Sequence, residues 1–235
     1  MNLYLTIQSK FISLAASHPR LFIPIFRLLF PPSSQRLTVS KDTQIVIEGF
    51  PRSANTFAAV AFQMAQPRQL KMAHHIHDAA QVIEGVRLSI PVMVLLRNPI
   101  HAVRSLVVRN PEIDPTQAFQ NYISFYRAVE DVAQNTVVAH FDIVTTNFDI
   151  VIENINRKFN TNFSLFGHTD SNVKKVYKLI EEVNIIRDGG KETDVARPSQ
   201  ERNEIYKKTS MEVSSQLVSQ AQEIYNVINK FSSNT

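Results

Sequence analysis

Residues 44–57 read Gln-Ile-Val-Ile-Glu-Gly-Phe-Pro-Arg-Ser-Ala-Asn-Thr-Phe. The first part is apolar and rich in β-branched residues, which predicts a buried strand. Gly49 and Pro51 then predict a tight turn, and Asn55 or Thr56 begins a helix. Because the free backbone N–H groups of a helix start attract anions, this layout predicts a loop that binds phosphate.

From Gly49 onward the spacing is that of the nucleotide-binding P-loop, but Ala54 and Asn55 stand where that motif requires Gly and Lys. Arg52 adds a cation with bidentate geometry. Ser53, Asn55 and Thr56 add side chains that can form hydrogen bonds with phosphate oxygens. The alternative is an ordinary turn between a strand and a capped helix, with no ligand.

The composition indicates one globular domain. The chain has 235 residues, of which 44% are hydrophobic and 20% charged, enough for one sizeable core. It contains no cysteine, which excludes disulfides, thiolate zinc sites and cysteine nucleophiles. The lack of cysteine fits a reducing compartment, so we expect the protein in the cytoplasm.

The positive charge is concentrated at the N-terminus. Residues 1–40 contain four basic residues and no acid, and they account for the whole formal charge of +4. We therefore predict a basic amphipathic segment at 1–40 and a single domain at 41–235. The apolar part of the segment at 1–40, residues 21–30, is too short to span a bilayer, which takes roughly 20 apolar residues. It could cover the core or a substrate cleft, or lie on an anionic membrane surface.

Beyond residue 35, short apolar strands alternate with amphipathic helices, which predicts an α/β fold with three layers, a parallel sheet flanked by helices. Strands are expected at 45–48, 91–96 and 137–141, with a weaker one at 70–73. Helices are expected at 56–66, 78–88, 99–109, 115–134, 148–159, 171–183 and 200–231. The glycines and charges of residues 188–194 predict a mobile loop or lid.

A second candidate phosphate site follows the strand at 91–96. Arg97 ends that strand, and Asn98-Pro99 is typical of a helix cap with proline at the first helical position. Ser105 lies two turns into the helix. Both groups would face the edge where open α/β sheets bind their ligands. The alternative is a surface ion pair for Arg97 and a packed hydroxyl for Ser105.

The two motifs together resemble those of the sulfotransferases that use 3′-phosphoadenosine 5′-phosphosulfate (PAPS). The 5′-phosphosulfate loop of that family typically reads Pro-Lys-Ser-Gly-Thr-Thr-Trp, and residues 51–57 stand in the same frame. Its 3′-phosphate motif opens with Arg-Asn or Arg-Asp and reaches a serine eight residues later, as Arg97 and Ser105 do. The resemblance covers about residues 43–160, over a P-loop-like nucleotide-binding fold.

The resemblance implies a role for each matching residue. The loop from Arg52 through Ser53, Ala54, Asn55, Thr56 and Phe57 would bind the 5′-phosphosulfate, with Phe57 either stacking on adenine or packing in the core. Arg97 and Ser105 would bind the 3′-phosphate. The family's C-terminal Arg-Lys-Gly is absent here. Arg197 is the nearest substitute, or a solvated arginine at a helix start.

The resemblance also implies a catalytic base that removes a proton from the acceptor hydroxyl, for which histidine is suited near neutral pH. The family's histidine lies about 22 residues before the 3′-phosphate arginine, which selects His75, with His77 as the rival. Arg52 occupies the position of the family's lysine. Because arginine stays charged, we expect it to stabilise charge and not to donate a proton.

The implied reaction moves a sulfuryl group from PAPS to a hydroxyl of a carbohydrate, lipid or small metabolite and leaves adenosine 3′,5′-bisphosphate. We expect no metal, because His74, His75 and His77 have no second cluster to complete a coordination shell. We expect no nucleic-acid partner, because the basic residues are spread singly. The sequence does not indicate the oligomeric state. The alternatives are a non-catalytic nucleotide-binding protein and a divergent P-loop kinase.

Overall fold

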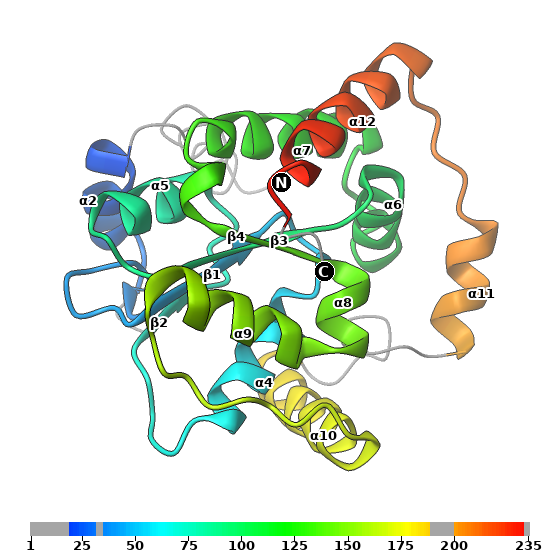
Figure 1. The fold of residues 1–235 in the computed structure, drawn as a ribbon. Helices are drawn as coiled ribbons and strands as arrows, with labels where there is room; N and C mark the ends of the chain where they lie inside the picture. The colour runs from blue at the N-terminus through cyan, green and yellow to red at the C-terminus, as the bar shows by residue number, and fades with distance from the viewer. Residues whose placement is uncertain (1–18, 32–34, 189–199, 233–235) are drawn as a thin grey trace.

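The computed structural model describes residues 19–31, 35–188 and 200–232. Within these ranges, four strands form one parallel sheet in the order β2-β1-β3-β4 (Figure 1). They are β1 (Ile45–Gly49), β2 (Met72–His74), β3 (Val92–Leu96) and β4 (Val137–His140). The predicted parallel α/β fold is therefore confirmed, and the strands lie within two residues of their predicted ends.

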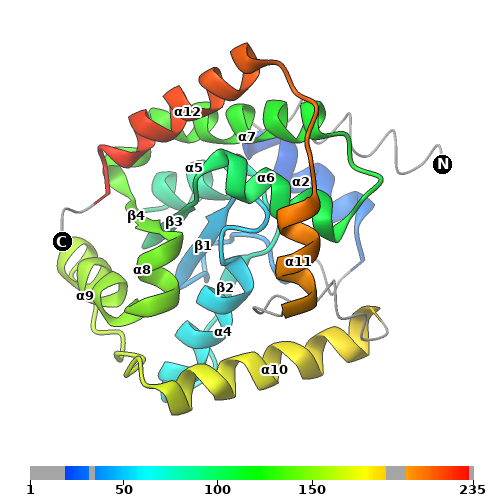
Figure 2. The same ribbon diagram turned by 90° about the vertical axis from the view of Figure 1, so that its right-hand side faces the viewer.

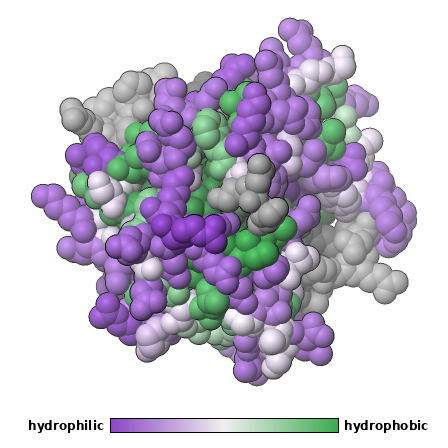
Figure 3. Space-filling view, in the orientation of Figure 1, coloured by the Kyte–Doolittle hydropathy of each residue, from purple (hydrophilic) through white to green (hydrophobic). Residues whose placement is uncertain are grey.

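Helices cover both faces of the sheet, which is why every residue of β1 and β3 is buried (Figures 1 and 2). One apolar layer lies under α2 (Pro19–Leu29), α5 (Ala79–Arg87), α6 (Pro99–Arg109), α7 (Pro115–Glu130) and α12 (Ser215–Asn229). The other lies under α4 (Asn55–Ala65), α9 (Phe148–Phe159) and α10 (Asp170–Asp188). The side of the molecule that faces the viewer in Figure 3 is mainly hydrophilic, with apolar side chains grouped between the hydrophilic ones.

Side-chain caps fix where several helices begin. Asp78 accepts a hydrogen bond from the backbone N–H of Ala80 at the start of α5. Asn98 accepts from Ile100 and His101 at the start of α6, where Pro99 occupies the first helical turn as predicted. These caps hold each helix at a defined point after the strand that precedes it.

The structure differs from the helix predictions at several places, and the helix predicted at 171–183 extends as α10 to Asp188. The single helix predicted at 200–231 is wrong, because α11 (Gln200–Lys208) and α12 are separate and the Ser214 hydroxyl caps a new start by accepting from Leu217 N–H. The helix predicted at 115–134 ends at Glu130, and a 3₁₀ turn follows at Ala133–Asn135. The short helix α8 (Phe141–Thr146) was not predicted. The lid predicted at 188–194 lies, beyond Asp188, outside the described residues.

The described part of the N-terminal segment belongs to the core. Phe22, Ile23 and Phe26 of α2 are buried in the same apolar cluster as α5 and α7. The Arg27 guanidinium donates hydrogen bonds to the Thr38 hydroxyl and the Val39 carbonyl, which ties α2 to the chain ahead of β1. No helix in the described ranges is long and apolar enough to cross a membrane.

Candidate functional site

The loops that leave the carboxyl ends of the strands surround a cavity of about 780 Å³. Arg52 and Thr56 follow β1, His75 follows β2, and Arg97 follows β3. Phe141 follows β4. This is the edge at which open α/β sheets bind ligands, and the volume is that of a small-molecule site.

The cavity lining is rich in arginine and histidine and poor in acids. Among the described lining residues, the only acid is Asp142. Against it stand three arginines and four histidines, namely Arg52, Arg97, Arg109, His75, His77, His101 and His140. A cavity of this charge favours a ligand with several negative charges.

The loop between β1 and α4 has an unusual backbone. Arg52 and Ala54 have φ values of 70° and 71°, in the left-handed region that favours glycine. Ala54 is also the N-cap of α4 and provides no side-chain cap. A strained backbone of this kind costs about 1 to 3 kcal/mol per residue and is found mainly where the surroundings or a ligand require it. The first N–H groups of α4, which have no partner within the helix, are therefore available to an anion.

The close approach of β1 and β3 explains the glycine that opens this loop. A Cβ at Gly49 would lie 2.5 Å from the carbonyl oxygen of Leu95. Any other residue would push the two strands apart at the point where they deliver Arg52 and Arg97. We predicted this glycine because of the turn, but the structure requires it because β1 and β3 pack closely at this position.

Two predicted phosphate ligands, Ser53 and Asn55, are buried inside the loop. Ser53 is fully buried and is not among the lining residues. Asn55 is 4% exposed, and its side-chain amide donates a hydrogen bond to the Phe50 carbonyl at 3.0 Å. The Ser53 hydroxyl and the side-chain oxygen of Asn55, Oδ1, are buried without a hydrogen-bond partner in the described structure. Contact between these side chains and phosphate stays a prediction.

Phe57 packs in the core, which was one of the two positions expected for it. The ring is 3% exposed and packs edge-on against Phe148 and Phe166. It still contributes to the cavity wall beside Tyr177. Its neighbours occupy most of the ring surface that stacking on adenine would need.

The two predicted phosphate sites are in direct contact. The Arg97 guanidinium donates a hydrogen bond to the Arg52 carbonyl at 2.8 Å and lies over the Phe141 ring, 3.9 Å from its centroid. Arg52 Nε donates to the Ser105 hydroxyl at 3.2 Å. Burial lowers the pKa of Arg97, because removal from water disfavours its charge. An anion in the cavity would offset that cost.

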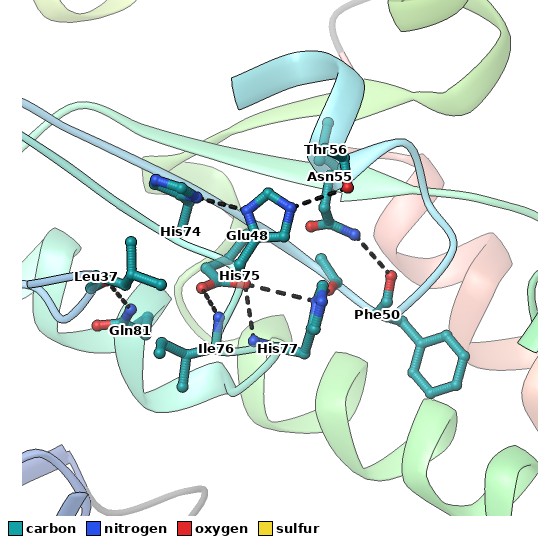
Figure 4. A network of polar contacts seen from close by, with 12 residues as sticks. Leu37, Glu48, Phe50, Asn55, Thr56, His74, His75, Ile76, His77 and Gln81 are labelled. Carbon is teal, nitrogen blue, oxygen red and sulfur yellow. Dashed lines mark hydrogen bonds and ion pairs between the residues drawn. The ribbon is translucent and has the colours of Figure 1, made fainter. Parts of the chain in front are cut away.

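A buried glutamate holds the loop that carries the histidines (Figure 4). Glu48 on β1 is fully buried, and its two carboxyl oxygens accept hydrogen bonds from the backbone N–H groups of Ile76 at 2.9 Å and His77 at 3.1 Å. His75 and His77 have φ values of 62° and 57°, so the loop turns sharply between them. Glu48 thereby fixes both candidate bases against the loop that follows β1.

The structure brings both candidate bases into the cavity. His75 Nε2 forms a hydrogen bond with the Thr56 hydroxyl at 3.0 Å, and His75 Nδ1 contacts Nδ1 of His74. His77 Nδ1 lies 3.0 Å from the Gly49 carbonyl oxygen, which can only accept, so Nδ1 carries the proton and Nε2 keeps a lone pair. Burial lowers the pKa of His77, and Arg109 and Arg52 lower it further, which favours the neutral base.

Sequence reasoning missed Glu48 and part of α6. A single acid in the otherwise apolar strand at 45–49 was the available signal for Glu48, since buried charges usually have a specific partner. His101, Ser105 and Arg109 all line the cavity from α6. Their spacing of four residues places them on one helix face, a pattern that could have extended the prediction beyond Ser105.

The C-terminal helices complete the wall. Tyr206 of α11 donates or accepts a hydrogen bond with His101 Nδ1 at 2.6 Å, and Tyr225 of α12 also lines the cavity. Arg197, predicted to replace the missing phosphate motif, lies outside the described residues. Within the described ranges, no three side chains are grouped as metal ligands.

No family model and no curated protein matches this chain.

The buried Glu48 predicts a pH-dependent stability. Burial raises the pKa of Glu48 to about 8 from an ordinary 4.5, with a small further rise from Asp78. The folded protein therefore keeps a proton that the unfolded chain loses in this range, and the resulting stability declines as the pH rises through about 8. From pH 5 to 8.5, wild type should lose about 4 kcal/mol relative to Glu48→Gln, which cannot titrate.

Denaturant unfolding of wild type and Glu48→Gln at several pH values measures this difference. Asp78, whose pKa burial raises to about 7, titrates in the same range. The same pair of proteins with Asp78→Asn, which keeps a side-chain oxygen for the α5 cap, separates its contribution from that of Glu48. A difference in unfolding free energy that stays constant across the range would show that Glu48 is ionised in the folded state.

Proposed function

We propose that this chain is a sulfotransferase that moves a sulfuryl group from PAPS to an acceptor hydroxyl. The observation that carries the proposal is the cationic cavity, in which an uncapped helix start and a pair of arginines from two neighbouring strands meet at the carboxyl edge of a parallel sheet. A ligand with two separated phosphate groups suits this arrangement.

The residues present fit such a nucleotide. The first N–H groups of α4 and the Arg52 guanidinium would hold the 5′-phosphosulfate, and Thr56 adds a hydroxyl on the same helix turn. Arg97 and Ser105 would hold the 3′-phosphate, with Arg109 one helix turn further along the same face. The net positive charge of this wall is the property that the ligand would neutralise.

The reaction needs in-line positioning, a base and neutralisation of charge on the leaving phosphate. PAPS supplies the sulfuryl group and adenosine 3′,5′-bisphosphate as the leaving group. His75 would accept the hydroxyl proton at Nε2, and His77, also with a lone pair on Nε2, is the rival base. Arg52 would stabilise the developing charge, and no metal takes part.

The acceptor class is a carbohydrate, a lipid or a small metabolite. We place the enzyme in the cytoplasm. Because Phe22, Ile23 and Phe26 are buried in the core, peripheral membrane contact of residues 1–40 would involve other side chains, such as the exposed Leu28. No nucleic-acid partner is proposed.

One observation separates this proposal from a P-loop kinase. Asn55 occupies the position of the kinase lysine, is buried, and uses its amide to hold the Phe50 carbonyl. No cation would therefore meet the transferred phosphate from that position. A non-catalytic nucleotide-binding protein would share the cavity but transfer nothing.

Ligand-induced thermal stabilisation tests the nucleotide class. Adenosine 3′,5′-bisphosphate at 100 times its dissociation constant should stabilise the fold by about 2.7 kcal/mol, or about 5 to 10 °C in Tm for a chain of this size. Removing one charged hydrogen-bond partner, as in Arg52→Ala or Arg97→Ala, should weaken binding about 10- to 100-fold.

Arg87→Ala is the matched control, because Arg87 is exposed, pairs with Glu84 on α5 and is not among the cavity residues. It should bind like wild type. Stabilisation by ATP with magnesium, and none by adenosine 3′,5′-bisphosphate, would contradict the proposal.

Substitution of the histidines separates the two bases. His75→Ala should reduce sulfuryl transfer from PAPS to a panel of carbohydrate, lipid and phenol acceptors by about 10²- to 10⁴-fold. The affinity for adenosine 3′,5′-bisphosphate should stay within the range of wild type, since the base contacts the acceptor. If His77→Ala shows the loss and His75→Ala does not, the base is His77.

A further inference from the structure

His74 is a polar residue at the end of β2 to which the proposed reaction gives no role. Its Nδ1 contacts Nδ1 of His75, and the two rings meet edge-on with centroids 4.8 Å apart. On the other side of His75, Nε2 bonds to the Thr56 hydroxyl. His75 is therefore held at both nitrogens, as Figure 4 shows.

A contact between two Nδ1 atoms contains one proton, and its position decides what His75 can do. If His74 carries the proton, a neutral His75 has its own proton on Nε2 and cannot accept another there. If His75 carries it on Nδ1, Nε2 keeps a lone pair, which accepts from the Thr56 hydroxyl in this structure and would accept from an acceptor hydroxyl once Thr56 turns to the 5′-phosphosulfate. Only the second arrangement makes His75 a base toward an acceptor hydroxyl.

The surroundings of His74 favour a neutral ring, and a neutral ring has one nitrogen that can accept a hydrogen bond. His74 lines a second cavity, of about 860 Å³, together with Arg27, Arg36 and Lys71. The described lining of this cavity includes no acid, so repulsion disfavours a further positive charge on His74. His75 lies in the main cavity, where Arg52 and His77 are neighbouring charged and titratable groups. Glu48 bonds to the loop that carries His75.

We propose that His74 is a positioning residue for His75, whose Nδ1 accepts the Nδ1–H of His75, fixes its tautomer and stabilises the imidazolium formed in the reaction. This role is the one that the aspartate has in a Ser-His-Asp triad. The inference rests on the proposed function. As the acceptor oxygen bonds to sulfur and the bond from sulfur to the bridging phosphate oxygen breaks, the hydroxyl proton moves to His75 Nε2 and the Nδ1 proton stays on His75.

The tautomers can be measured on the full chain without donor or acceptor. Two-dimensional ¹⁵N NMR of the imidazole rings should show His75 protonated on Nδ1 and unprotonated on Nε2, and His74 protonated on Nε2. A His75 ring with its proton on Nε2 and a His74 ring with its proton on Nδ1 would overturn the proposal.

Two variants distinguish positioning from folding. In His74→Asn the amide oxygen can accept the Nδ1–H of His75, so the tautomer and most of the transfer rate should persist. In His74→Ala that acceptor is lost, so His75 should populate the Nε2–H tautomer and transfer should fall about 10- to 100-fold, as for other groups that orient a functional histidine. An unchanged His75 tautomer in His74→Ala would refute the role.

The affinity for adenosine 3′,5′-bisphosphate should be equal in wild type, His74→Asn and His74→Ala, because His74 does not line the main cavity. Weaker binding by His74→Ala would make the role structural and overturn the proposal. If none of the three proteins binds this nucleotide, the proposed function fails, while the NMR measurement still decides the arrangement of the two histidines.

Discussion

The site depends on two hydrogen bonds, which the backbone N–H groups of Ile76 and His77 donate to the buried carboxyl group of Glu48. β1 delivers the phosphate-type loop and β2 delivers the histidine loop, and the pairing of the two strands ends at Ile47 and His74, before either loop begins. Without a common anchor, the short loop after β2 would lose two backbone hydrogen bonds and the sharp turn between its left-handed residues. A fully buried acid on β1 is thus a structural requirement of the histidine arrangement.

Several unfavourable features of the structure occur at this one edge of the sheet. Arg52 and Ala54 adopt left-handed backbone, α4 begins without a side-chain cap, and burial lowers the pKa of Arg97. Asp78, Asn98, Asp114 and Ser214 cap their helices, whereas α8 and α9 also begin without a side-chain cap. Ser89 and Asn160 are left-handed residues outside the cavity, so such features are concentrated at this edge but not confined to it. Local violations that gather at one place are expected at a functional site, where a ligand offsets their cost.

The sequence predicted the layers and the sheet because strands buried on both faces are continuously apolar, as in Val92–Leu96. It also predicted that Arg52, His75, Arg97 and Ser105 line one cavity, since each follows or flanks the carboxyl end of a strand. Tertiary contacts could not be read in this way. Glu48 looked like an ordinary strand residue, and the break between α11 and α12 depends on a cap at Ser214 within a polar stretch that continues the helical pattern.

A structure of the complex with adenosine 3′,5′-bisphosphate tests the central claim most directly. The account predicts the 5′-phosphate at the first N–H groups of α4 beside Arg52, the 3′-phosphate between Arg97 and Ser105, and His75 at the reacting side of the 5′-phosphate. A nucleotide bound in the second cavity beside Arg27 and Lys71, or in the main cavity with no phosphate at the start of α4, would contradict it.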